Sequence, residues 1–361
     1  MTDYRIRQDD IAFLEKILLT NTPSGNEREI IRLLKEQPDI CDMNTDIMGN
    51  LYLKTGSGPG KVMITAHCDE VGFQVTSIDE NGFVYVRRLG GLDKHCIPGT
   101  KVVVTGSNPP ICGVFGKKSP HIQTKEESGK LLELEDLWID FGFDSKDDAS
   151  DYIHIGDYIT AMATPMLLSN KNRIVSKGLD NKISVFILWE AMKFLSKMSL
   201  DSIEVTGVVT TQEEIGCRGG IVATQIVKPD IAFCLDVGIA TDIPSKLDKK
   251  CGNFRLGDGP GINRNPDNNE MLEKLLIEVA DKNDIKYQQT IGFCPTGGTE
   301  TARIQLLSEG VVTANISIPN RYMHSAVEMC DLSDAENSIK LIVAAIKELN
   351  NTDFSQFNLY N

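Results

Sequence analysis

The sequence lacks any excess of basic residues. Its 361 residues include 37 Lys and Arg against 51 Asp and Glu, which gives a formal net charge of −14. Because nucleic-acid phosphates are bound by basic surfaces, this balance argues against a nucleic-acid-binding protein. It also argues against an electrostatic membrane anchor, since anionic lipid surfaces attract basic segments.

Long apolar stretches are missing as well. The first ten residues, "MTDYRIRQDD", are charged and do not resemble a secretory signal. The longest apolar run, residues 183–189, is far too short to span a bilayer. Nine scattered cysteines without a C-x-x-C pair predict neither a disulfide framework nor a thiolate zinc site. We therefore expect a cytoplasmic protein, and we interpret Cys68 and Cys217 as small apolar fillers.

The pattern along the chain changes twice, and the length suggests two domains. Residues 73–164 contain short β-like runs separated by turn residues, whereas helices and strands alternate after residue 173. Alternation of this kind predicts an α/β/α layered domain with a mixed, largely parallel sheet. We assign residues 1–72 and 165–361 to this domain and residues 73–164 to an inserted, barrel-like β domain. Near the N-terminus, Ser24 and Glu27 have the spacing of a capping box for a helix.

Acidic and histidine side chains stand where the predicted strands end or the next helices begin. They are His67, Asp69, Asp180, Glu213, Glu214, Asp236 and His324. In a largely parallel sheet the carboxyl ends of the strands meet at one edge, so these side chains are expected to converge. Taken singly, each has an ordinary explanation: a structural histidine, a helix cap or a solvated acid.

Taken together, so many acids at one edge require a compensating cation. Clustered carboxylates repel one another and raise each other's pKa values unless positive charge is present. A mixed set of histidines and carboxylates is typical of sites for Zn²⁺ or a similar divalent ion. Three ligating carboxylates and one hydroxide carry four negative charges, which favours two divalent ions over one.

Six motifs in this order make the chain similar to a known enzyme family. They are "AHCDEVGF", "SKGLDNKIS", "TTQEEIGCRGG", "LDVGIATDIP", "PTGGTETA" and "RYMHSAVEMCDL". The series resembles the M42 family of binuclear metallo-aminopeptidases and runs from near Pro23 to the last predicted helix. That family includes glutamyl and deblocking aminopeptidases, some of which form tetrahedral dodecamers.

The resemblance implies a ligand set for two divalent ions, Zn²⁺ or Co²⁺. Asp180 corresponds to the bridging ligand of the family. His67 and Asp236 would complete one metal site, and Glu214 and His324 would complete the other.

The same resemblance implies roles for residues around the metals. Glu213 corresponds to the general base, and Asp69 to the acid that orients the first metal-ligating histidine. Glu300 stands where the family usually has Asp, so we assign it tentatively to substrate binding. Two further departures, 181–182 and 238–239, leave the predicted ligands in place but put the substrate preference in question.

The main prediction is a metal-dependent aminopeptidase that acts on short peptides. A deacylase or amidohydrolase of acylated small molecules is an alternative, because the same site would cleave any suitably placed amide. Glycoside hydrolysis by paired carboxylates ranks lower, because it does not explain the histidines. A catalytically inactive scaffold is the non-enzyme alternative. The resemblance also implies a homo-oligomer, with a dodecamer as one form, and a role of the β segment in assembly and substrate access.

Overall fold

The computed structural model describes residues 4–38, 40–244, 248–292 and 296–359. Its largest element is an eight-stranded mixed sheet. In spatial order the strands are β1 (Asp42–Thr45), β2 (Leu51–Gly56), β12 (Ile203–Thr210), β3 (Gly60–His67), β13 (Ile231–Ile239), β16 (Val312–Asn320), β14 (Gly261–Asn263) and β15 (Gln288–Thr290). The four central strands β12, β3, β13 and β16 are parallel, and antiparallel pairs with β2 and β14 flank them.

Helices cover both faces of this sheet, because the central strands alternate buried side chains toward each face. Val62, Ile64 and Ala66 of β3 pack into the main hydrophobic cluster, and Met63 packs into a cluster on the opposite face. The main cluster includes residues of α1 (Gln8–Leu19), α5 (Leu179–Leu195), α8 (Glu270–Lys282) and α10 (Leu332–Leu349). The opposite cluster includes residues of α6 (Arg218–Val227) and α9 (Thr301–Ile304). The predicted α/β/α layering is thus confirmed.

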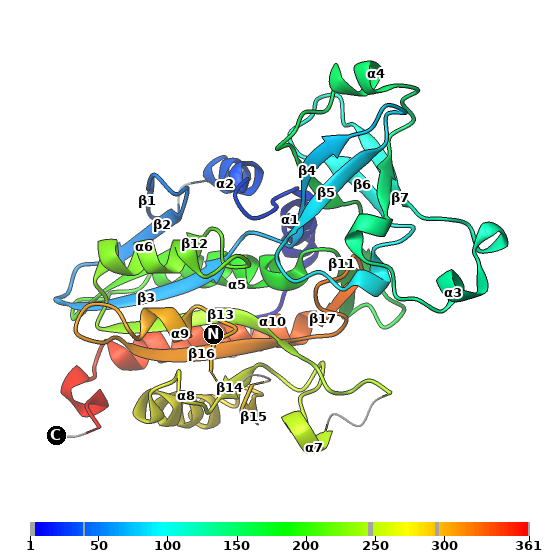
Figure 1. The fold of residues 1–361 in the computed structure, drawn as a ribbon. Coiled ribbons are helices and arrows are strands. Elements are labelled where there is room, and N and C mark those ends of the chain that lie inside the picture. The colour runs from blue at the N-terminus through cyan, green and yellow to red at the C-terminus, as the bar shows by residue number, and fades with distance from the viewer. Residues whose placement is uncertain (1–3, 39, 245–247, 293–295, 360–361) are drawn as a thin grey trace.

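Six strands form a closed barrel beside the large sheet (Figure 1). In order around the barrel they are β4 (Gly72–Ile78), β5 (Val84–Leu89), β8 (Trp138–Asp140), β7 (Cys112–Gly116), β6 (Lys101–Val104) and β9 (Tyr158–Ala161). The pairing of β4 with β9 closes the barrel, and Phe73, Val75, Phe115 and Ile139 belong to its own hydrophobic cluster. The barrel-like part of the predicted fold is therefore present.

Shorter elements complete the described chain. A small antiparallel sheet contains β10 (Met166–Leu167), β11 (Arg173–Ser176) and β17 (Glu328–Asp331). The remaining helices are α2 (Arg28–Lys35), α3 (Lys125–Ser128), α4 (Lys146–Ser150) and α7 (Asp248–Cys251), and the 3-10 turns are Lys94–Cys96, Pro120–Ile122, Leu134–Asp136 and Phe354–Phe357. None of the described helices is long and apolar enough to cross a bilayer.

The capping box predicted for α2 is not formed. The N-cap position is Glu27, and its side chain makes no capping hydrogen bond. The Ser24 hydroxyl instead donates to Asp69 at 2.6 Å, and Glu27 accepts from the backbone amides of Gly25 and Gln212. Hydrogen bonds to residues far away in the sequence thus form in place of the predicted capping box.

Candidate metal centre

Parallel strand ends bring the candidate residues together. His67 is the last residue of β3 and pairs in register with Thr210, the last residue of β12. Glu213 and Glu214 follow three and four residues later, and Asp236 lies on β13, the other neighbour of β3. Adjacent parallel strands therefore place Glu213 and Asp236 beside the His67 imidazole.

Asp180 is turned out of the helix in which it lies. The N-cap of α5 is Gly178, which has a left-handed backbone with φ +60°, and Asp180 itself has non-helical angles of φ −80° and ψ 101°. Its backbone amide donates to Glu328 at 2.8 Å instead of entering the helical hydrogen-bond pattern. The carboxylate is free to point at both histidines: Oδ1 lies 3.3 Å from Nε2 of His67, and Oδ2 lies 3.2 Å from Nε2 of His324.

His324 lies in the turn between β16 and β17, with a left-handed φ of +62°. Its backbone amide donates to Glu328 at 2.8 Å, and its Nδ1 lies 2.6 Å from the Gly91 carbonyl oxygen. Its Nε2 lies 3.5 Å from the carboxylate of Glu214. Glu328 thus holds the backbones of both Asp180 and His324, a role that sequence reasoning missed. The available signal was an acid four residues after His324, inside the motif "RYMHSAVEMCDL".

The ligand atoms form two groups that share one residue. His67, Asp180 and Asp236 make the first group, and Asp180, Glu214 and His324 make the second. Within each group the candidate ligand atoms lie within 4.8 Å of one another. Asp180 presents one oxygen to each group, which is the arrangement required of a bridging carboxylate.

The charges in this cluster fit divalent cations. Burial raises the pKa of Glu214 to about 7, with a further contribution from Asp180, and its buried Oε1 has no hydrogen-bond partner within the described part of the chain. Burial lowers the pKa of His324, but the neighbouring carboxylates of Asp180 and Glu214 outweigh this effect and raise it to about 12. Without a metal, the negative charge must be balanced by protons, either on the imidazoles or on the carboxylates themselves. A divalent ion among these donors would remove that need, so the residues fit the expected group.

Asp69 connects three parts of the centre. Its Oδ1 accepts the Glu213 amide at 2.9 Å and lies 3.3 Å from Nδ1 of His67. Its Oδ2 accepts the Glu214 amide at 3.1 Å and the Ser24 hydroxyl at 2.6 Å. Asp69 is fully buried, so its position fits the expected orienting role and excludes direct contact with a substrate.

Glu213 stands beside the ligand groups without belonging to either. Its Oε2 lies 3.9 Å from Nε2 of His67, and its Oε1 lies 3.1 Å from the thiol of Cys217. Burial, followed by neighbouring acids, holds the pKa of Glu213 well above its usual value. Cys217 is therefore more than the apolar filler expected from the sequence, because its thiol orients a carboxylate. Cys68 is fully buried in the main hydrophobic cluster, as a filler would be.

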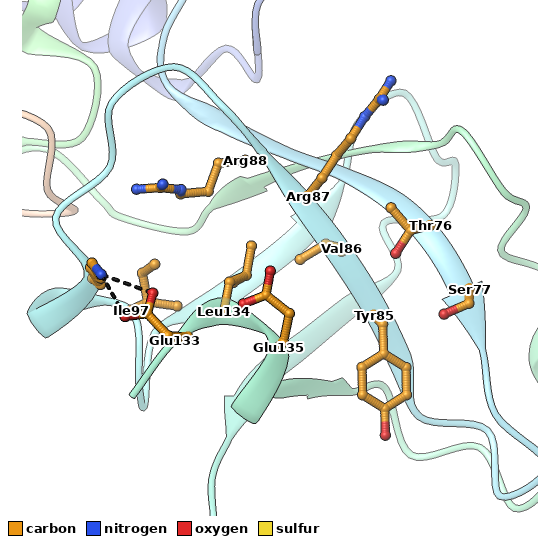
Figure 2. Close-up of a pocket in the computed structure, with 11 residues that line it drawn as sticks. Thr76, Ser77, Tyr85, Val86, Arg87, Arg88, Ile97, Glu133, Leu134 and Glu135 are labelled. Carbon is orange, nitrogen blue, oxygen red and sulfur yellow. Dashed lines mark hydrogen bonds and ion pairs between the residues drawn. The ribbon is translucent and has the colours of Figure 1, made fainter. Parts of the chain in front are cut away.

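A cleft of about 710 Å³ opens over these residues. Its lining includes four of the predicted site residues, His67, Asp180, Glu213 and His324, together with Thr299 and Arg303. A second hollow of about 410 Å³, on the barrel, is lined by residues of β5 and by Glu133 and Glu135 (Figure 2). It includes none of the predicted site residues, so the chemistry is expected in the first cleft.

Glu300 does not line the cleft, although its chain neighbours Thr299 and Ala302 do. It is only 3% exposed, and its Oε1 lies 2.5 Å from the point that a Cβ on Gly220 would occupy. Burial raises its pKa to about 7. Its position beneath α6 therefore does not support the tentative substrate contact.

Of the other departures from the family pattern, Asn181 and Lys182 are fully buried, and Gly238 and Ile239 line the cleft. Asn181 donates to the Leu235 carbonyl at 2.8 Å. Pro295, the first residue of "PTGGTETA", lies outside the described residues.

The layered fold and the shared histidine–carboxylate cluster define an α/β protein with a candidate two-metal centre. A model of the M42 glutamyl aminopeptidase family matches residues 49–341. The lysyl aminopeptidase of Pyrococcus furiosus is 32% identical over 354 residues, which cover 96% of this chain and 99% of that protein. The chain therefore belongs to the M42 peptidase family, and the family resemblance is confirmed.

Solved structures agree with this assignment. A TET aminopeptidase from a marine-sediment thaumarchaeon has a TM-score of 0.91 and 30% identity, covering 97% of this chain and 99% of that chain. The TET1 peptidase of Pyrococcus horikoshii, described as assembling into a tetrahedron or a large octahedral shell, has a TM-score of 0.83 and 29% identity. The two alignments cover nearly all of both proteins, with 93% of this chain and 98% of that chain in the second case.

Proposed function

We propose that the chain is a metal-dependent aminopeptidase that removes N-terminal residues from short peptides and uses two divalent ions, Zn²⁺ or Co²⁺. The observation that carries this proposal is the position of Asp180, which turns one carboxylate oxygen toward each of two histidines. Membership of the M42 peptidase family supports the same reaction class.

Five residues would hold the ions. Asp180 would bridge them, with His67 and Asp236 on one side and Glu214 and His324 on the other. Ions bound in this way supply Lewis acidity, which polarises a peptide carbonyl and lowers the pKa of water from 15.7 to about 7.

Glu213 would move the proton. It is held beside the ligand groups by the Asp69–amide hydrogen bond and by the Cys217 thiol, with Oε2 facing the cleft near His67. From this position it can accept a proton from the attacking water and deliver it to the leaving amine. Burial raises the pKa of Glu213 above that of an ordinary glutamate, which makes its carboxylate a stronger base.

Recognition of the free α-amino group would fall to the acids that line the cleft. Asp69 is fully buried and Glu300 is 3% exposed, so neither is available for this contact. Glu213, Glu214 and Asp236 line the cleft and supply negative charge beside the expected scissile bond. A free ammonium group fits such surroundings better than an acylated amine, which has no charge and more bulk.

A matched substrate panel tests the reaction. Free peptides, the same peptides with N-acetyl groups, and acylated amino acids are each incubated with enzyme and added Zn²⁺ or Co²⁺. We expect stepwise release of N-terminal residues from the free peptides, and slow or absent cleavage of the acetylated ones. Asp180→Ala is the control for contaminating peptidases. A clear preference for the acylated compounds would replace this proposal with the deacylase alternative.

We also propose that residues 73–164 form a separate domain and that the protein assembles into a homo-oligomer. The barrel's own hydrophobic cluster supports the first point. Related structures described as a dodecamer and as a tetrahedron support the second. Light scattering at micromolar concentration tests the assembly, and a monomer would contradict it. We place the protein in the reducing cytoplasm, where the buried free thiols of Cys68, Cys217 and Cys234 would persist.

A further inference from the structure

The turn that follows β5 leaves the barrel and reaches the candidate metal centre. The Gly91 carbonyl oxygen lies 2.6 Å from Nδ1 of His324, and the Asp93 amide donates to the His324 carbonyl at 3.3 Å. The turn thus contacts both the ring and the backbone of one histidine. Arg88, on the barrel strand before the turn, donates to the Leu92 carbonyl at 3.4 Å and lines the hollow in Figure 2.

The first two residues of this turn have no room for a side chain. A Cβ on Gly90 would lie 2.7 Å from Val71 and 3.4 Å from the Cβ of Glu214, and the φ of Gly90 is +85°. A Cβ on Gly91 would lie 3.2 Å from Nδ1 of His324. Glycine at both positions thus lets the barrel backbone approach two residues of the second ligand group.

The turn also packs closely against the segment that carries His324. The cavity left between them is about 30 Å³ and is lined by Leu92, Asp93, His324 and Ser325 among others. The contacts of Gly91 and Asp93 with His324 hold the turn against this segment. The turn therefore has little freedom to move while His324 keeps its position.

The chemistry of the ring contact fixes which nitrogen is available. A carbonyl oxygen can only accept, so Nδ1 of His324 must carry the proton that it shares with Gly91. In the neutral ring this leaves the lone pair on Nε2, the atom that faces Asp180 and Glu214. A histidine that ligates a metal is commonly oriented in this way, and loss of the orienting partner typically weakens metal binding about 10–100-fold.

Different parts of the chain orient the histidine in the two ligand groups. His67 turns Nδ1 toward Asp69, which lies two residues further along the same segment of the large sheet. His324 turns Nδ1 toward a barrel residue 233 positions away in the chain. The first group is thus complete without the barrel, and the second is not.

We infer that the barrel turn Gly90–Asp93 is a positioning element for the second metal site, so that seating of the barrel controls occupancy of the site formed by Asp180, Glu214 and His324. This inference rests on the proposed two-metal function. Because coupling between two events is reciprocal, metal bound at this site must also stabilise the contact of the turn with His324. The first site, formed by His67, Asp180 and Asp236, should be insensitive to the turn.

Gly91→Ala in the full-length protein tests the inference through metal binding alone. The methyl group meets the His324 ring at 3.2 Å, and the backbone of Gly91 does not have the left-handed φ that would exclude alanine. Gly129→Ala is the matched control, because a Cβ there would meet nothing within 4 Å. Metal-free protein is titrated with Zn²⁺ by calorimetry, and His324→Ala gives the reference for a lost second site.

We expect Gly91→Ala to bind the ion that is lost in His324→Ala about 10–100-fold less tightly and the other ion unchanged, while Gly129→Ala matches the wild type. Unchanged binding of both ions to folded Gly91→Ala would overturn the inference and leave the proposed function intact. A wild-type protein that binds fewer than two ions would overturn the proposed function, and this inference with it.

A second measurement does not use Gly91→Ala. Hydrogen exchange is followed by mass spectrometry in the peptide that contains Gly90–Asp93, with and without Zn²⁺. We expect metal to slow exchange of the Asp93 amide in the wild type and to have no such effect in His324→Ala. Exchange in this turn that does not respond to metal in the wild type would contradict the coupling.

Discussion

Replacing Glu213 with glutamine should separate proton transfer from metal binding. The side chain keeps its size, and the backbone amide still donates to Asp69 at 2.9 Å. The amide oxygen can still accept from the Cys217 thiol, which lies 3.1 Å from Oε1. What is lost is the ability to accept a proton on the side that faces His67. Because Glu213 belongs to neither ligand group, both ions should remain bound.

The expected loss of activity follows from the proposed role of Glu213 in proton transfer. General acid–base catalysis contributes typically 10²–10⁴-fold, or about 3–5 kcal/mol of activation free energy. We therefore expect kcat for release of the first residue from a free peptide to fall by about 10²–10⁴-fold, with two ions per chain by elemental analysis. Glu204→Gln is a suitable control. Glu204 lies near the start of β12, the strand that precedes Glu213, and pairs at the surface with Lys54.

Two outcomes would refute this reasoning in different ways. A loss of less than about tenfold with both ions bound would mean that another group moves the proton. A loss of metal together with activity would mean that Glu213 is a ligand, and the distinction between Glu213 and Glu214 would have to be abandoned. Glu204→Gln should retain full activity, because its contacts lie far from the cleft.

Four other buried residues give predictions of their own. Asp180→Ala should lose metal from both sites, whereas Asp236→Ala should keep one ion, because only Asp180 is shared; full metal content in Asp180→Ala by elemental analysis would contradict the bridge. Cys217→Ala should keep both ions but lower kcat roughly threefold to tenfold, the worth of one hydrogen bond to Glu213, and unchanged kcat would make the thiol a filler. Burial raises the pKa of Glu300 from 4.5 to about 7, so the folded state binds this proton more tightly than the unfolded state. The free energy of unfolding should fall as pH rises between these values, and Glu300→Gln should flatten that slope in metal-free urea titrations; parallel slopes would contradict the shift.

The grouping of the ligand residues was predictable because it follows from one topological rule. His67 and Glu213 lie close together because β3 and β12 are parallel and in register at their ends, with His67 opposite Thr210. Parallel strands with helical crossovers leave a strong signal of alternating apolar segments, and polar residues after such segments stand out. The layers, the barrel and this edge of the sheet were therefore accessible from the sequence.

Several other features were not predicted. Some elements are too short to show a sequence pattern, and one contact joins residues that are far apart in the sequence. The strands β14 and β15 have three residues each, too few to show an alternating pattern. The strand β1 has the sequence "DMNT" and no buried residue, so no apolar pattern marks it. The capping box at Ser24 failed for a different reason, since a buried carboxylate 45 residues away bonds its hydroxyl.

The support of the ligands was the least predictable part, because it depends on which segments pack together. Asp69 accepts the backbone amides of Glu213 and Glu214, which lie 144 and 145 residues away, and Glu328 accepts those of Asp180 and His324. Each buried carboxylate uses its two oxygens to fix two amides at once, so each sets the relative position of two residues.

These hydrogen bonds from backbone amides help to explain how so many buried acids can lie close together in the centre. A carboxylate that accepts two backbone amides is stabilised by these fixed dipoles, although burial still holds the pKa of Glu328 well above its usual value. Asp69 and Glu328 are held in this way, which leaves Asp180, Glu214 and Asp236 as the acids that lack such support on both oxygens. The need for positive charge is thereby concentrated on the three carboxylates that face the two histidines. The surrounding contacts would thus direct a metal to one place in a cleft that contains several acids.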